Sequence, residues 1–322
     1  MNMIAPASGG LHSFGRSPLT GSTDTVLVHE LDVAQIVLGY RLRLGVDVSR
    51  LFAGVSTLRL LHEPATGLSF FDPPILGDGA FYDELARHPG YYPGERQEFA
   101  LAAAHVPPGA RVCEIGAGAC SFPAHIPHAD YVGLEFSKAA IEQARTRGIT
   151  LLPEDVVDFA RVRGEAFDVT CAFQVLEHVR EPLAFIEAMA ALTRPGGRII
   201  LSTPNAEAYI ARSRDVLNVA PHHHTWWTDR CWSWVADRLG FARLELLHSS
   251  IDEVLMPWAR MVAADGLANM LGLELHPVVD ERPIRHRIDV LAEQTARTIV
   301  AGLRHRNDVP LLGHSTVAVF TR

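Results

Sequence analysis

Apolar residues in the first third of the chain change their spacing twice. Over residues 24–52 they recur at mostly helical intervals, which predicts one or two amphipathic helices. Residues 55–61 alternate as a short strand does, and residues 67–71 follow the same pattern until the prolines after Asp72 end it. A further helix is expected over residues 81–88. Together these segments predict an N-terminal cap over residues 24–94, and the Gly-, Ser-, Thr- and Pro-rich residues 1–23 predict a loose tail rather than a signal peptide.

From residue 95 onward strands and helices alternate, which is typical of a parallel sheet covered on both faces. The clearest helix is expected over residues 182–192, because apolar residues form one stripe there and a Pro-Gly-Gly turn follows. The expected strands cover residues 111–115, 131–135, 150–152, 167–173, 197–203, 243–248 and 316–321. The sheet domain is therefore expected over residues 95–250, and residues 314–322 return to it as the last strand.

Residues 251–313 form an expected insertion before that last strand. Its first part carries apolar residues at helical spacing, including Ile251, Leu255 and Trp258, which predicts a helical flap packed on the core. A face that binds a second copy of the chain, giving a homodimer, and a helix at a membrane surface are the alternatives.

Charge and composition exclude several classes of function. A formal charge of -8 and a pI near 6.0 do not supply the basic surface that nucleic-acid binding needs. The four cysteines contain no C-x-x-C pair, and no apolar stretch of about 18 residues could span a membrane. We therefore expect a cytoplasmic protein. Lys138 is the only lysine, and it lies in neither a phosphate loop nor a Tyr-x-x-x-Lys motif. This disfavours P-loop NTPases, reductases that use a Tyr-x-x-x-Lys motif, and pyridoxal enzymes.

The strongest chemical signal is a hydrophobic strand that ends in an acid and a small-residue turn, Glu114-Ile115-Gly116-Ala117-Gly118. Glycines let backbone amides approach a ligand closely. About 20 residues later a second strand ends in Glu135, where a carboxylate can accept hydrogen bonds from two ribose hydroxyls. This pattern fits a dinucleotide or S-adenosylmethionine.

The rest of the chain decides between these two cofactors. The glycine turn, the Glu135-Phe136-Ser137 segment, residues 153–156, residues 167–178 and the Pro-Gly-Gly turn at residues 195–197 together resemble class I S-adenosylmethionine-dependent methyltransferases. The resemblance implies an α/β Rossmann-like fold with a seven-stranded sheet in the order 3-2-1-4-5-7-6, the last strand antiparallel. One departure is Cys120, which stands where the family pattern has a third glycine and could narrow the space near the cofactor's amino-acid end.

The resemblance also implies a set of cofactor-binding residues. Glu135 would bind the ribose hydroxyls, and Phe136 would pack against adenine. Asp155 would accept a hydrogen bond from the adenine amino group, beside the backbone of Val156. Glu154 is the alternative residue for this role if the alignment is shifted by one position. Gln174 would face the amino-acid tail. The turn residues that would line the methionine and ribose are Glu114, Gly116, Ala117 and Gly118.

A loop after the fifth strand supplies the candidate catalytic residues. Residues 217–228 resemble a bacterial branch of these enzymes with a proline and paired histidines before a tryptophan, whose members are often assigned to the modification of sugars or secondary metabolites. A small-molecule or saccharide acceptor is therefore expected. Methyl transfer rests largely on positioning, so an amine or carbon acceptor needs little more, but a hydroxyl benefits from a base with a pKa near neutrality. His223, then His222, are the expected bases, and His178 beside Glu177 is a further candidate.

The other residues of this region carry weaker expectations. Tyr91, Tyr92, His224 and Trp226 would line the acceptor pocket, under a roof formed by the cap and the insertion. The histidine run could instead be solvated or cap the next helix at Thr228. We expect no metal at this run, because adjacent side chains diverge and no carboxylate is evident at ligand spacing.

Three rival functions are weaker. The Asp72-Pro73-Pro74-Ile75 segment is similar to the signature of enzymes that methylate nucleic-acid bases, but it lies far from the fourth strand and lacks the aromatic residue at Ile75. A nicotinamide oxidoreductase lacks its Tyr-x-x-x-Lys motif. The third alternative is a binding protein that keeps the methyltransferase fold but does not catalyse a reaction. The only feature of the sequence that favours it is Cys120.

Overall fold

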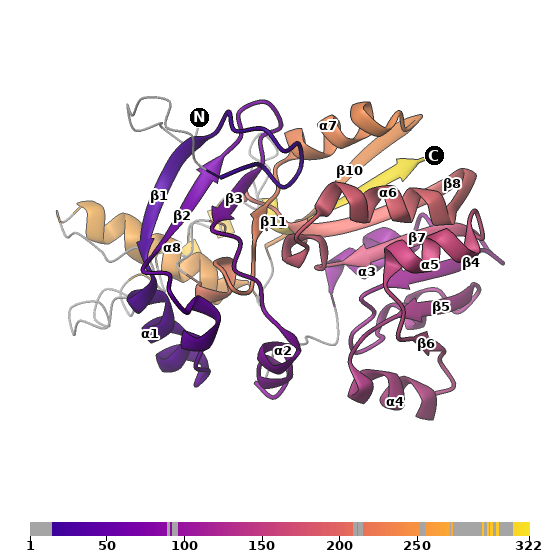
Figure 1. The fold of residues 1–322 in the computed structure, drawn as a ribbon, viewed down its shortest axis with the longest axis horizontal. Coiled ribbons are helices and arrows are strands. Elements are labelled where there is room, and N and C mark those ends of the chain that lie inside the picture. The colour runs from indigo at the N-terminus through magenta and orange to yellow at the C-terminus, as the bar shows by residue number, and fades with distance from the viewer. Residues whose placement is uncertain are drawn as a thin grey trace.

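The computed structural model describes residues 15–88, 91, 96–208, 211, 215–251, 255–270, 272, 292, 295, 297–298, 301–302 and 312–322. Two sheets organise these residues (Figure 1). The larger has seven strands and the smaller has four.

The seven-stranded sheet has the order β10-β11-β8-β7-β4-β5-β6. Its strands are β4 Arg111–Ile115, β5 Asp130–Leu134, β6 Leu151–Leu152, β7 Phe167–Phe173, β8 Thr193–Pro204, β10 Arg243–Ser250 and β11 Leu312–Thr321. β11 runs antiparallel to both of its neighbours, whereas β4 to β8 pair in parallel. The expected fold class and strand order are confirmed.

Helices cover both faces of this sheet. The helices are α3 Gln97–Ala103, α4 Lys138–Thr146, α5 Val156–Arg163, α6 Pro182–Leu192 and α7 Asp229–Leu239. Successive strand residues point to opposite faces, so Ala172 packs with α5, α6 and α7 while its neighbour Cys171 packs with α3. This alternation makes two apolar layers, one on each face of the sheet. The polar residues of the candidate site lie at the carboxyl ends of β4, β5 and β7, beyond these layers.

The cap is built on an antiparallel sheet of order β1-β2-β3-β9. Its elements are β1 Val26–Asp32, α1 Val33–Leu44, β2 Thr57–His62, β3 Ser69–Asp72, α2 Gly79–Leu85 and β9 Thr225–Trp226. The fourth strand, β9, thus comes from outside the 24–94 range expected for the cap. It pairs Phe70 with Thr225 and Ser69 with Trp226, which joins the loop after β8 to the cap.

The expectation of helix over residues 24–52 is wrong for its first part. Residues 26–32 form β1, which pairs antiparallel with β2 along its length, and only then does α1 begin. Asp32 fixes that boundary, since its side chain accepts from the N–H of Ala34 at 2.9 Å and caps the helix. Helical spacing and strand pairing compete in this segment, and the neighbouring β2 decides the outcome.

Residues 15–23 also differ from the loose tail expected there. Leu19 is 2% exposed, and the Ser17 hydroxyl donates to the buried carboxylate of Glu63 at 2.7 Å. The Thr66 hydroxyl donates to the same carboxylate at 2.8 Å. A buried acid with hydroxyl donors holds this segment against β2.

The insertion begins with α8, Met256–Met270, which lies beside the cap (Figure 1). Trp258 donates from Nε1 to Asp215 at 2.5 Å, so the helix is tied to the loop between β8 and β9, which carries His222 and His223 and is called the histidine loop below. Most of residues 271–311 lie outside the described part of the chain. Among the described helices, none has the length and hydropathy needed to cross a bilayer.

Candidate functional site

The glycine turn after β4 packs tightly against the segment that follows β7. Gly116 has φ +71° and Gly118 has φ +51°, both in the left-handed region that favours glycine. A Cβ at Gly116 would lie 2.6 Å from Cγ2 of Val175. The N–H groups of Gly116 and Ala117 both donate to the carbonyl of Leu134, at 2.8 and 3.2 Å. The turn is therefore fixed between the ends of β5 and β7.

Cys120 adopts the conformation of the glycine it replaces, with φ +57°. Its side chain is 1% exposed and packs with Ala117, and its Sγ lies 3.6 Å from the hydroxyl of Tyr131. Arg147 donates to the carbonyl of Cys120 at 2.9 Å and to that of Ala119 at 3.0 Å. The thiol is accommodated in the packing under the turn, and Arg147 holds the backbone in place.

Glu135 directly follows β5 and faces the glycine turn. Its carboxylate accepts from the N–H of Gly118 at 2.8 Å and from the N–H of Ser137 at 2.8 Å, one bond to each oxygen. A carboxylate has about four acceptor positions, so two stay available for ribose hydroxyls. Phe136 beside it is 67% exposed, which offers an aromatic face to a base.

Glu114 is buried beneath the turn. The Tyr131 hydroxyl donates to it at 2.5 Å. Burial raises the pKa of Glu114 to about 8, an effect that the Tyr131 hydrogen bond and the positive charge of Arg96 oppose. At neutral pH this carboxyl group is therefore largely protonated.

We expect this carboxyl group to make stability fall as pH rises from about 5 to 8. The folded state holds a proton on Glu114 that the unfolded chain, with an ordinary pKa of 4.5, has already lost in this range. Glu114→Gln should make the free energy of unfolding depend less on pH. Relative to the unmodified protein, the variant should gain about 1–3 kcal/mol more stability at pH 8 than at pH 5. Urea unfolding at the two pH values measures this, with exposed Glu142→Gln as the control. Identical slopes for all three proteins would contradict it.

The residues expected at the adenine and at the amino-acid tail are each engaged in the fold. Asp155 caps α5 by accepting from the N–H of Val157 at 2.8 Å, which leaves its second oxygen for a ligand. Glu154 is exposed and Val156 is buried. Gln174, with φ +55°, directs its amide toward the Ser315 hydroxyl at 3.2 Å, on the β11 side of the sheet.

Three histidines meet at the carboxyl end of β7. His178 follows Val175 in a short turn, and His222 and His223 come from the loop after β8. The rings of His222 and His223 stack at 4.5 Å, and their centroids lie 4.5 and 5.1 Å from that of His178. The expectation that adjacent side chains diverge is thus wrong for His222 and His223.

The ring nitrogens of these histidines differ in what they bond. Nδ1 of His178 bonds the carbonyl of His222 at 2.5 Å, and Nδ1 of His222 bonds the carbonyl of Leu217 at 2.8 Å. His222 also bonds the Tyr91 hydroxyl through Nε2 at 2.9 Å. Nδ1 of His223 has no hydrogen-bond partner among the described residues. His223 and His178 thus keep a nitrogen for other chemistry, whereas both nitrogens of His222 are bonded.

Burial keeps these rings neutral. It lowers the pKa of His178 to about 4 and the pKa values of His222 and His223 well below their ordinary range. Glu177 is completely buried among them, and its Oε1 lies 3.9 Å from Nε2 of both His178 and His223. Burial also raises the pKa of Glu177 to about 8.

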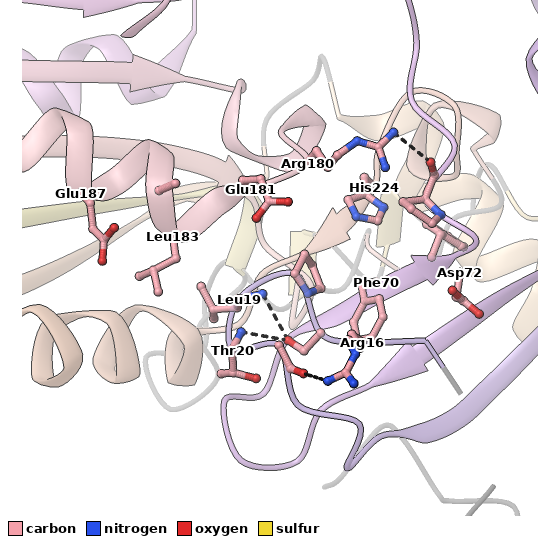
Figure 2. Close-up of a pocket in the computed structure, with 16 residues that line it drawn as sticks. Arg16, Leu19, Thr20, Phe70, Asp72, Arg180, Glu181, Leu183, Glu187 and His224 are labelled. Atoms are coloured by element: carbon pink, nitrogen blue, oxygen red, sulfur yellow. Dashed lines mark hydrogen bonds between the residues drawn. The ribbon is translucent and has the colours of Figure 1, made fainter. Parts of the chain in front are cut away.

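His224 points away from this cluster. It lines a cavity of 470 Å³ between the Arg16–Gly21 segment, β3 and the start of α6, as Figure 2 shows. Arg180 lies beside His224 there and donates to the carbonyl of Pro74 at 3.5 Å. Cap packing holds Trp226, whose ring meets Phe71 edge-on. The side chain of His224 thus lies at the cavity and that of Trp226 in the cap, rather than in the histidine cluster.

Two further expectations concern the cap of α7 and the position of Tyr92. Thr228 caps α7 with Cys231, so the histidines do not cap that helix. Tyr92 lies outside the described residues.

Glu177 and Arg96 are the residues that the sequence reasoning undervalued. The sequence pattern marks Glu177 only as the neighbour of His178, although its side chain is 0% exposed at the centre of the cluster. Arg96 directly precedes α3, and its charge acts on Glu114 and Glu177, where it opposes the larger effect of burial on each pKa. An acid next to a histidine after the fourth strand was a usable signal; a single arginine before the first sheet strand was not.

Comparison with known proteins gives a consistent result. A family model described as "Methyltransferase domain" matches residues 86–246. The ubiquinone biosynthesis O-methyltransferase of Proteus mirabilis is 24% identical over 195 residues, covering 56% of this chain and 71% of that protein. The protein of the same name from Vibrio vulnificus is 30% identical over 145 residues, covering 40% of this chain and 62% of its own length, which is less than two thirds.

Solved structures with a related fold include two methyltransferases. A SAM-dependent methyltransferase from Archaeoglobus fulgidus is 13% identical with a TM-score of 0.47, covering 70% of this chain and 94% of that one. A Haemonchus contortus phosphoethanolamine N-methyltransferase bound to S-adenosylhomocysteine is 12% identical with a TM-score of 0.47, covering 75% and 56%.

Proposed function

This chain belongs to the methyltransferase domain family, for which S-adenosylmethionine is the methyl donor, and from that premise we propose that it methylates a hydroxyl group of a small molecule. The observation that carries the proposal is that Nε2 of His178, just after β7, and Nε2 of His223, in the loop after β8, both lie 3.9 Å from Oε1 of buried Glu177. Val175, three residues before His178, contacts the glycine turn. The O-methyltransferase names of the curated relatives favour the same acceptor group.

The residues around the glycine turn fit the cofactor. Glu135 has acceptor positions left for ribose hydroxyls, exposed Phe136 offers its ring to adenine, and Asp155 has a free oxygen for the adenine amino group. The bound cofactor supplies a methyl group on a sulfonium sulfur, which keeps the electron pair of the broken carbon–sulfur bond. The chain's own contribution is to orient this group and to exclude water from it.

The cofactor assignment is tested by calorimetric titration with S-adenosylhomocysteine. We expect micromolar binding that Glu135→Ala weakens by about 1–3 kcal/mol, because charge-assisted hydrogen bonds to the ribose are lost. Glu142→Ala, a change at an exposed acid on α4, is the matched control and should bind as the unmodified protein does. Equal binding by both variants would remove Glu135 from the site, and preference for NADH would contradict the cofactor.

The proton of the acceptor hydroxyl is proposed to leave through the histidine cluster. Nδ1 of His223 has no hydrogen-bond partner among the described residues, and as a neutral imidazole His223 can take up a proton. Oε1 of Glu177 lies 3.9 Å from Nε2 of His223, so it would face the imidazolium that results as a hydrogen-bond acceptor. His178 is placed to do the same through Nε2, so the two share this role.

We expect His223→Ala to lower kcat for a hydroxyl acceptor by about 10²–10⁴-fold while leaving S-adenosylhomocysteine binding intact. The measurement is transfer of isotopically labelled methyl groups to a panel of hydroxyl-bearing small molecules, including saccharides. Amine-bearing molecules form the second arm of the panel. If only amines are methylated, and His223→Ala is as active as the unmodified protein, positioning alone suffices and the O-methylation proposal fails.

A further inference from the structure

We propose that His178, His222, His223 and Glu177 form a binding site for a divalent transition-metal ion of the kind that prefers imidazole, such as Zn²⁺. One candidate ligand atom from each of the three histidines lies within 4.8 Å of the others. The inference rests on the proposed function at the same site, where a bound metal would take over from the histidine base in activating the hydroxyl, but metal binding is measurable without any acceptor.

Glu177 provides independent support for a cation here. Its side chain is 0% exposed, and neither carboxylate oxygen has a hydrogen-bond partner among the described residues. A buried carboxylate without partners is costly, and proteins ordinarily pair such groups with a donor, a cation or a metal. Oε1 lies 3.9 Å from both His178 Nε2 and His223 Nε2, so the unpartnered oxygen faces the histidine nitrogens.

Backbone carbonyls orient two of the histidines as they do in metal sites. Metal-binding histidines ordinarily donate their second ring N–H to a carbonyl or carboxylate, which leaves the other nitrogen with its lone pair toward the metal. His178 bonds the carbonyl of His222 through Nδ1, and His222 bonds the carbonyl of Leu217 in the same way. Both therefore present Nε2 in the neutral form that a metal requires.

The ligand atoms would have to move closer together to bind one ion, because the three histidine atoms lie within 4.8 Å of one another. Ligand atoms that lie about 2.0–2.2 Å from a zinc ion at tetrahedral angles are about 3.3–3.6 Å apart. The 3.9 Å separations at Glu177 exceed this by a few tenths of an ångström. Nε2 of His222 bonds the Tyr91 hydroxyl at 2.9 Å, so a metal would take the place of that hydroxyl.

The ligand set selects the metal and suggests a role. Three imidazoles and one carboxylate suit Zn²⁺, Fe²⁺ or Ni²⁺ rather than Mg²⁺ or Ca²⁺, which prefer oxygen. The ligand His178 donates its backbone N–H to the carbonyl of Val175 at 3.0 Å, and Val175 contacts the glycine turn. The metal would lower the pKa of an acceptor hydroxyl bound to it, and His178 and His223 would then serve as ligands rather than as bases.

The test uses the full chain after removal of metals with a chelator. Zn²⁺ is titrated by calorimetry, and Co²⁺ is added as a probe whose visible absorption reports nitrogen and oxygen ligands. We expect one ion per chain, no competition from excess Mg²⁺, and at least tenfold weaker binding in His223→Ala and in Glu177→Gln. His224→Ala is the matched control, because its ring lies in the same loop but faces the separate cavity. Tyr91→Phe should not weaken binding, since it frees Nε2 of His222.

S-adenosylhomocysteine titration of each variant separates the two proposals. Variants that keep this binding are folded, so their loss of Zn²⁺ or Co²⁺ binding reports on the ligands and supports the site. Protein that binds S-adenosylhomocysteine but no metal overturns the metal site and leaves the methyl-transfer proposal standing. Metal binding that is unchanged in His223→Ala and Glu177→Gln also overturns it, because the ion then binds elsewhere. Metal binding that depends on these residues, without cofactor binding, would support the metal site and count against the proposed function.

Discussion

Replacing Gly116 with alanine is expected to abolish cofactor binding and to destabilise the protein by more than its backbone conformation alone explains. Two effects add. An L-residue at φ +71° costs about 1–2 kcal/mol, and the new Cβ would lie 2.6 Å from Val175 Cγ2, which overpacks the turn by about 1–3 kcal/mol more. The turn would move, and with it the amides that we propose approach the cofactor. Urea unfolding and S-adenosylhomocysteine titration measure the two effects.

Gly148 offers a closely matched control for this experiment. It has φ +73°, almost the same conformation, but a Cβ there meets no atom within 4 Å. Gly148→Ala should therefore cost about 1–2 kcal/mol of stability and leave cofactor binding unchanged. Adding Val175→Ala to Gly116→Ala should restore part of the binding. Equal losses in the two alanine variants would show that the contact with Val175 is unimportant.

The second large effect is expected at Trp232. Its side chain is fully buried and stacks on Trp227 at a centroid distance of 4.6 Å. Trp232→Ala should lower the free energy of unfolding by about 3–5 kcal/mol, since it opens a cavity under α7 and removes the support of Trp227. The measurement is urea denaturation followed by circular dichroism.

Trp234, in the same helix, provides the comparison. It is only half-buried, so Trp234→Ala should cost clearly less. Trp232→Phe should also cost less than Trp232→Ala, because it keeps an aromatic ring and removes a buried indole N–H that has no acceptor among the described residues. If Trp232→Ala and Trp234→Ala were equally stable, the stack on Trp227 would not be a major contribution.

Sequence patterns predicted the features that depend on local order along the chain. The glycine turn and Glu135 follow directly from where two apolar strands end, and the structure brings Gly118 and Glu135 within 2.8 Å of each other. The strand order, which the family resemblance implied, is confirmed. Phe136 was expected to pack against adenine, and its 67% exposure makes it available, but its role stays a prediction.

Features that depend on contacts between distant segments could not be predicted. β1 has the spacing of a helix, and only its partner β2 makes it a strand. The pairing of β9 with β3 joins residues more than 150 positions apart, and no local pattern encodes it. The same holds for the histidine cluster, because the sequence placed His222 and His223 with His224, whereas folding places them with His178 and Glu177.

The histidine loop belongs to both sheets, and this has a consequence for protein engineering. Its first residues, including Val216 and Val219, lie in the apolar core of the cap, β9 extends the cap sheet, and Trp227 returns to pair with Asn205 at the end of β8. A chimera that joins this cap to the catalytic half of another methyltransferase would have to carry residues 205–227 with it. Exchange of acceptor preference between such enzymes should therefore succeed only when cap and loop are transplanted as one module.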